Sequence, residues 1–298
     1  MEIKQLMYFR EVAKVGNISK AAEMMHVAQP ALTLSIQKLE RELSLVLFDR
    51  SRKPLALTNE GEIFLKRIES LIHQYDDILA EMRDLVNDQI GRIRIGVPPM
   101  LGAYLFPPIF SEFHQSYSGI QLSIIEEGSL EVKKKLISDE LDIGVIMVED
   151  EMPMLNLMPI TTHEVKVCLP KNHPLAHVEV LSMDMLKNES FILLNEQTYM
   201  RQRVLTLCKE AGFEPHILFS SNQISTILRL VAQGSGIAFM LHSLAESTED
   251  IVALSLDEPL FINASLAWSK NSYVSRATKT FIEFIDGFSS RLQDTLKK

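Results

Sequence analysis

The stretch that decides the fold of the first domain runs from Gln29 to Thr58 and reads QPALTLSIQKLERELSLVLFDRSRKPLALT. Apolar residues recur in its first half at steps of four, three and four, which is the spacing of one buried helix face. They are Leu32, Ile36, Leu39 and Leu43. The opposite face is polar, with Gln29, Thr33, Gln37 and Arg41. We therefore predict a helix that begins at Gln29-Pro30, where proline suits the first turn.

Two shorter helices are predicted before it. The first carries an apolar face made of Leu6, Phe9, Val12 and Ala13. This pattern stops at Gly16-Asn17, and Ser19 is a suitable N-cap for a second helix that ends near His26. Two helices joined by a short turn, the second with a polar face, are the arrangement that places a recognition helix in the major groove. A plain helical hairpin with a solvated face is the alternative.

The second half of the stretch favours DNA binding over that alternative. From Leu47 to Thr58, alternating apolar residues flank a tight basic cluster. This pattern predicts a small β-hairpin wing that presents Arg50, Arg52 and Lys53 to phosphates or to a narrow minor groove.

The charge distribution agrees with a DNA-binding N-terminal segment. The 298 residues carry a net charge of −9, but residues 1–58 hold nine basic and six acidic side chains, so their own net charge is +3. The rest of the chain then carries −12. We expect DNA to be contacted through the first segment alone.

Length and composition predict a packed protein of at least two domains, with 46% hydrophobic and 23% charged residues. The charged start lacks the apolar core of a signal peptide, and no apolar stretch is long enough for a membrane span, so we expect a cytoplasmic protein. Cys168 and Cys208 are too few for a disulfide framework and have no partners at metal-ligand spacing, so we expect two buried thiols and no cofactor.

Residues 1–65 resemble the DNA-binding domain of LysR-type transcriptional regulators. The motifs that carry the resemblance are Leu6-x-x-Phe9, Ser19-x-x-Ala22, Gln29-Pro30-Ala31-Leu32, Ile36-x-x-Leu39-Glu40, Leu47-Phe48-x-Arg50 and Leu57-Thr58-x-x-Gly61. The resemblance implies a winged helix-turn-helix domain over 1–58, with the helix-turn-helix at about 18–37. The DNA contacts expected are Gln29, Pro30, Ala31, Thr33, Leu34, Gln37, Arg50, Arg52 and Lys53. Leu34 and Ser35 stand where the family usually has longer polar residues, and Leu34 suits a thymine methyl group.

A long connecting helix is predicted over 59–88. Seven apolar residues form a narrow heptad seam along it, namely Phe64, Ile68, Leu71, Tyr75, Ile78, Met82 and Leu85. A seam this narrow favours a dimer over a helix packed only on its own domain, for which a broader apolar face is expected. The family's paired linker helices agree with this, and we expect a homodimer or a tetramer.

Residues 91–298 alternate strand-like and helix-like segments, which predicts an α/β fold with mainly parallel sheets. They resemble the LysR effector domain, with two lobes like a periplasmic solute-binding protein, through Gly91-x-Ile93-x-Ile95-Gly96, Glu127-Gly128-Ser129, Leu141-Asp142-Ile143-Gly144 and Gly234-x-Gly236-Ile237. We expect one lobe over about 91–162 and 268–298 and the other over about 163–267.

Ligands of open α/β sheets lie beyond the strand ends, near helix N-termini that favour anions. This rule selects Pro99, Met100, Ser129, Met147, Thr198, Arg201 and Asn222 as effector contacts. Arg201 is the cation expected to bind a carboxylate, although a solvated helix arginine and N-capping serines are the alternatives.

No pattern of an enzyme or of a metal site emerges. Gly234-Ser235-Gly236 lacks the spacing of a nucleophile elbow, and Glu126 and Glu127 are adjacent in a strand and point to opposite faces. We expect a regulator that binds promoter DNA, a small effector such as an organic acid, a second copy of itself and RNA polymerase. The alternative function is a cytoplasmic solute-binding module whose N-terminal helices only mediate association.

Overall fold

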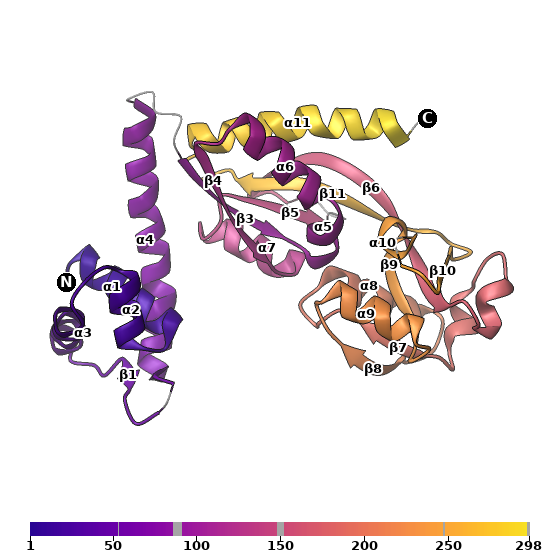
Figure 1. Ribbon diagram of the computed structural model, residues 1–298, viewed down its shortest axis with the longest axis horizontal. Coiled ribbons are helices and arrows are strands. Elements are labelled where there is room, and N and C mark those ends of the chain that lie inside the picture. Colours follow the sequence, from indigo (N-terminus) through magenta and orange to yellow (C-terminus); the bar gives the residue numbers. More distant parts are fainter. Residues whose placement is uncertain (53, 86–90, 148–151, 247, 297–298) are drawn as a thin grey trace. The chain divides into compact units, whose positions relative to one another are not determined.

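The computed structural model describes residues 1–52, 54–85, 91–147, 152–246 and 248–296. The chain divides into two compact units, Met1–Leu85 and Val86–Lys298, which are coloured from indigo to purple and from purple to yellow in Figure 1. The predicted linker helix therefore belongs to the first unit as far as Leu85, and its expected end at 86–88 lies outside the described residues.

Unit 1 is a helical bundle with a small hairpin. Its elements are α1 (Ile3–Val15), α2 (Ile18–Met24), α3 (Gln29–Leu43), β1 (Phe48–Asp49), β2 (Ala56–Leu57) and α4 (Asn59–Leu85). The core contains the apolar faces predicted for α1 and α3, including Phe9, Leu32 and Leu39, each fully buried. β1 and β2 pair antiparallel, which confirms the predicted wing hairpin.

The turn between α1 and α2 differs from the prediction in its cap. α1 ends at Val15 and is capped by Gly16, which has a positive φ of 63° that suits glycine. The Asn17 side chain, and not that of Ser19, caps α2 by accepting a hydrogen bond from Lys20 N at 3.0 Å. Asparagine and serine are both good N-caps, and with Asn17 as the cap the helix begins two residues earlier than it would with Ser19.

Unit 2 contains strands of both orientations. Its strands are β3 (Gly91–Val97), β4 (Ile120–Glu126), β5 (Ile143–Met147), β6 (Leu155–Pro170), β7 (Ser190–Leu193), β8 (His216–Ser220), β9 (Ala238–Leu241), β10 (Ile251–Leu254) and β11 (Leu260–Ser269). Its helices are α5 (Pro99–Tyr104), α6 (Phe106–Ser116), α7 (Ser129–Ile137), α8 (Tyr199–Glu210), α9 (Ile224–Ala232), α10 (His242–Glu246) and α11 (Arg276–Leu296), with short 3₁₀ turns η1 (Pro174–His177) and η2 (Met183–Leu186).

The expectation of mainly parallel sheets is wrong. β3 pairs parallel with β4 and β5, and β7 pairs parallel with β8. However, β6 pairs antiparallel with β9, β10 and β11, and β11 also pairs antiparallel with β5. The larger sheet in the described residues has the order β10-β6-β11-β5-β3-β4.

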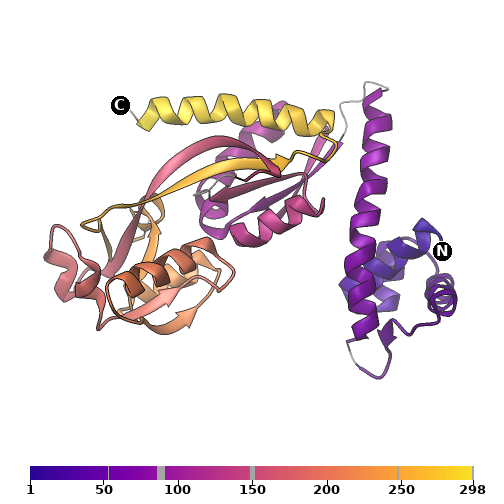
Figure 2. The same ribbon diagram turned by 180° about the vertical axis from the view of Figure 1, so that it is seen from behind.

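The two long strands β6 and β11 join two groups of elements in unit 2. Figures 1 and 2 show them passing from the group that contains β3, β4 and β5 to the group that contains α8, α9 and β7. Their pairing register shifts between Ala264 and Ser265, opposite Pro159 and Thr161. A proline cannot donate a hydrogen bond to the ladder, so a register shift is expected beside it. None of the described helices is long and apolar enough to span a membrane.

Candidate nucleic-acid interface and expected effector contacts

The outward face of α3 carries the residues expected to contact bases. The side chains of Gln29, Pro30, Ala31 and Leu34 are exposed, and those of Thr33 and Gln37 are half-buried. Leu32, Ile36 and Leu39 lie in the core on the other side of α3 and fix the orientation of this face. Amide, hydroxyl and methyl groups are thus displayed together on one rigid helix, which is what base-edge reading requires.

The wing is held against α3 by one carboxylate that the sequence reasoning did not select. Glu40 Oε1 accepts hydrogen bonds from the backbone N–H groups of Leu47, at 2.9 Å, and Phe48, at 3.3 Å. Its other oxygen, Oε2, accepts a hydrogen bond from Arg50 Nη2 at 2.9 Å. The Glu40 side chain is only 12% exposed. The resemblance motif Leu39-Glu40 was the available signal, because it places an acid at a fixed spacing from Arg50.

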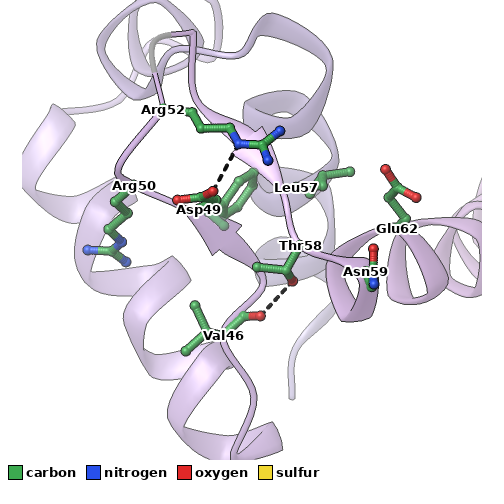
Figure 3. Close-up of a pocket in the computed structure, with 9 residues that line it drawn as sticks. Val46, Asp49, Arg50, Arg52, Leu57, Thr58, Asn59 and Glu62 are labelled. Atoms are coloured by element: carbon green, nitrogen blue, oxygen red, sulfur yellow. Dashed lines mark hydrogen bonds and ion pairs between the residues drawn. The ribbon is translucent and has the colours of Figure 1, made fainter.

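The described wing arginines are paired with carboxylates, and do not project singly as the sequence suggested. Arg52 Nε lies 3.1 Å from Asp49 Oδ2, and Lys53 lies outside the described residues. The hydroxyl and backbone N–H of Ser51, followed by Arg52, hold the pKa of the Asp49 carboxyl below its ordinary value. Arg50 and Arg52 both line a surface hollow of about 600 Å³. Figure 3 shows their side chains pointing away from each other. The Arg52 side chain remains 72% exposed, so it can still reach a phosphate.

The motif Leu57-Thr58-x-x-Gly61 joins the wing to α4. Thr58 Oγ1 donates to Val46 O at 2.7 Å, shown in Figure 3, and accepts from Gly61 N at 3.0 Å. A Cβ atom added to Gly61 would lie 2.2 Å from Leu47 O, so no other residue fits there without displacement of the backbone. These contacts fix the wing at both of its ends.

The predicted seam residues of α4 divide into two groups. Phe64 packs edge-on against Phe9 at 5.2 Å, and Ile68 is buried, so both belong to the core of unit 1. This corrects the expectation that they lie on a free seam, because the helices of unit 1 cover this end of α4. The next four residues are exposed, with 47% for Leu71, 36% for Tyr75, 56% for Ile78 and 49% for Met82. The side chain of Leu85 lies outside those described.

The expected effector contacts of unit 2 are largely engaged in contacts within the protein. Ser129 Oγ accepts a hydrogen bond from Met147 N at 3.3 Å, and Pro99, Met100 and Met147 are buried. Met100 is completely buried in the hydrophobic core, so its side chain faces neighbours and not a solvent-filled cleft.

The expected effector contacts around α8 also have partners within the protein. Thr198 caps α8 by accepting from Arg201 N at 3.4 Å, and Asn222 Oδ1 accepts from Asn195 N at 3.2 Å. Arg201 Nη1 donates to Leu194 O at 3.0 Å and to Ser220 Oγ at 2.7 Å. A carboxylate ligand would therefore have to share or replace these partners of Arg201.

Two of the expected effector segments meet directly. A Cβ atom added to Gly128, which precedes α7, would lie 2.1 Å from Gln197 O and 3.0 Å from Thr198 Cα. The N-terminal ends of α7 and α8 are thus in backbone contact, and only glycine permits this approach. Ser129 directly follows Gly128, so two of the predicted effector segments lie next to each other.

The two cysteines are buried thiols, as expected. Burial raises the pKa of Cys168 to about 12 and that of Cys208 to about 11. Because the thiolate is the reactive form, we expect iodoacetamide to label both cysteines at pH 8 at least about a hundredfold more slowly in the native protein than in denaturant. Mass spectrometry of timed samples measures both rates. Rapid native labelling of either cysteine would contradict the burial. No group of acidic, histidine or cysteine side chains suited to a metal ion occurs among the described residues.

Comparison with known protein families gives two matches that together span most of the chain. Residues 3–62 match the model of the bacterial regulatory helix-turn-helix protein, lysR family. Residues 87–289 match the model of the LysR substrate binding domain. The first match does not agree with the alternative in which the N-terminal helices only mediate association.

Individual proteins resemble the chain over nearly its whole length. An uncharacterized HTH-type transcriptional regulator, YcgK of Bacillus subtilis, is 32% identical over 303 residues, covering 95% of this chain and 93% of its own. The structure of a full-length OxyR variant from Pseudomonas aeruginosa has a TM-score of 0.69 at 26% identity and covers 98% of this chain and 95% of its own. Full-length CbnR in complex with its target DNA has a TM-score of 0.70 at 21% identity, with coverages of 96% and 99%.

Proposed function

Because this chain belongs to the LysR family of bacterial transcriptional regulators, we propose that α3 reads the major groove of a promoter through Gln29, Thr33 and Leu34. The observation that carries this proposal is the outward face of α3, where Gln29 and Leu34 are exposed and Thr33 is half-buried, while the inner face of the helix packs in the core. The same surface of α3 also carries Pro30, Ala31 and Gln37. The wing adds a contact to the DNA phosphate backbone through Arg52. The proposed DNA target puts the site of action in the cytoplasm.

The effector proposal concerns unit 2. A small organic acid binds between the two groups of elements joined by β6 and β11 and favours one of their arrangements, which changes how paired DNA-binding units meet their sites. RNA polymerase is the proposed partner that reads this change at the promoter. No resident cofactor is part of the proposal.

Replacing Thr33 with Ala is expected to change base preference more than overall affinity. A lost hydrogen bond to one base edge costs about 1–3 kcal/mol, or roughly five- to a hundredfold in affinity, only on duplexes that carry the preferred base. Gln29→Ala should do the same at a different position of the site. Binding titrations on a set of duplexes with single base changes measure both effects.

Lys38→Ala is the matched control, because Lys38 lies on the side of α3 that faces Glu2, with Nζ 3.5 Å from Glu2 Oε1. Its base preference should equal that of the unmodified protein. If Thr33→Ala and Gln29→Ala lowered affinity equally for every duplex, the proposed base-reading face of α3 would be wrong.

A further inference from the structure

Three large apolar side chains of unit 1 are exposed beside the proposed base-reading face of α3. Leu34 on the helix is 59% exposed, and Leu45 and Val46, which follow the helix, are 42% and 64% exposed. Neither the helical periodicity nor the resemblance motifs selected Leu45 and Val46. A single exposed apolar residue needs no explanation, but a group of them around one hollow indicates a contact surface.

The three side chains share one surface hollow of about 560 Å³. Its other lining residues are Gln37, Glu40, Arg41 and Ser44. The chain turns back after α3 at Ser44, which has a φ of 55°, and Leu45 N donates to Glu40 O at 3.0 Å. The carbonyl oxygen of Val46 accepts the 2.7 Å hydrogen bond from Thr58 (Figure 3). The backbone on both sides of this apolar hollow is therefore held in place.

The charged groups around the apolar hollow suit a negatively charged partner. The carboxylate of Glu40 is already engaged with two backbone N–H groups and with Arg50. Arg41 is exposed, and its Nε donates to Gln37 O at 3.3 Å, which places the side chain along the outer face of α3. An apolar surface bordered by an exposed cation matches a DNA strand, because apolar groups on the bases lie close to charged phosphates.

Thymine is the base that presents an apolar group in the major groove, namely its 5-methyl group. Leu34 and Gln37 belong both to the base-reading face and to the apolar hollow, so the hollow continues that face toward the C-terminal end of α3. We propose that Leu34, Leu45 and Val46 contact the methyl groups of neighbouring thymines on one DNA strand, with Arg41 at the adjacent phosphate. This inference rests on the proposed reading of DNA by α3 and adds the class of base that the hollow prefers.

Replacing single thymines with deoxyuridine tests the proposal, because uracil lacks the 5-methyl group but pairs with adenine in the same way. Footprinting of the full-length chain on its own promoter region first locates the protected thymines, and each one is then replaced in turn. At two or more neighbouring positions the affinity should fall by about fourfold, which is the factor expected for removal of one buried methyl group.

Alanine variants of the hollow connect this effect to particular side chains. Val46→Ala should make binding insensitive to the methyl group at one of these positions, and Leu34→Ala or Leu45→Ala at another. Val180→Ala is the matched control, because Val180 is also exposed, at 48%, but lies in unit 2. It should keep the full response to uracil. Since Val46 is exposed, its replacement should change the melting temperature by less than about 2 °C, so unfolding would not explain the result.

Equal affinity for thymine and uracil duplexes at every position would contradict the proposal. If the chain still selected its promoter over unrelated DNA, base reading by α3 would stand and only the thymine contact would fall, whereas a chain with no promoter preference would contradict both. Reduced assembly of Val46→Ala in analytical ultracentrifugation, with an unchanged response to uracil, would identify the hollow as a contact between two copies and would also overturn the proposal.

Discussion

Replacing Ile78 with Glu is expected to convert the protein into monomers and to lower its affinity for promoter DNA by about a hundredfold or more. Ile78 lies in the exposed apolar stripe of α4, beside Leu71, Tyr75 and Met82. A carboxylate in this stripe would be buried without a partner if two copies paired there. Two linked DNA-binding units gain roughly 10²–10⁴ in affinity over one, and this gain disappears with the dimer.

Analytical ultracentrifugation measures the assembly, and titration of a two-half-site promoter fragment measures the affinity. Ala80→Glu is the matched control, because Ala80 lies about 200° around α4 from Ile78 and carries the same new charge on the opposite side. The control should remain a dimer. An Ile78→Glu protein that stays dimeric would show that the stripe on α4 is not the interface.

Replacing Glu40 with Ala is expected to lower both stability and affinity for all DNA sequences. The change removes the acceptor of the buried Leu47 and Phe48 N–H groups and the partner of Arg50. Leaving two buried donors unsatisfied costs about 2–4 kcal/mol of unfolding free energy. A wing that is no longer fixed to α3 should also make poorer contacts with the DNA phosphate backbone. We expect the affinity for DNA to fall by about tenfold, independently of base sequence.

Glu40→Gln separates the two parts of this effect, because the amide oxygen can still accept the backbone N–H groups but carries no charge for Arg50. Its melting temperature should lie between those of the unmodified chain and Glu40→Ala. Arg50→Ala should weaken binding to all DNA, as Glu40→Ala does, without the full loss of stability. If Glu40→Ala melted and bound like the unmodified chain, the hydrogen bonds from Leu47 and Phe48 would not hold the wing.

Local sequence patterns were sufficient to predict helix α3 and the wing of the N-terminal unit. The apolar face of α3 and the alternation on both sides of the basic cluster predicted the helix and the wing, because both signals lie within about 30 residues. The pairing of Glu40 with Arg50 was not predicted. It exists only after the wing folds back on α3, and sequence periodicity does not report on a contact of this kind.

Unit 2 was less predictable because its long strands depend on distant partners. The first half of β6 contains Pro159 and shows no clean alternation, yet β6 is held by β11, some hundred residues later in the chain. The expected effector contacts show a similar limit. Ser129 and Thr198 were chosen as ligand groups, and the structure uses them to accept a backbone N–H group and to cap a helix.

The central claim is sequence-specific DNA binding by paired units, and the most direct measurement is a titration of the full-length chain with its own promoter region over a range of salt concentrations. We predict a complex that survives excess unrelated DNA, protects two half-sites separated by whole turns of the duplex, and weakens steeply as salt rises. Binding that shows no preference for the promoter at any salt concentration would contradict the account.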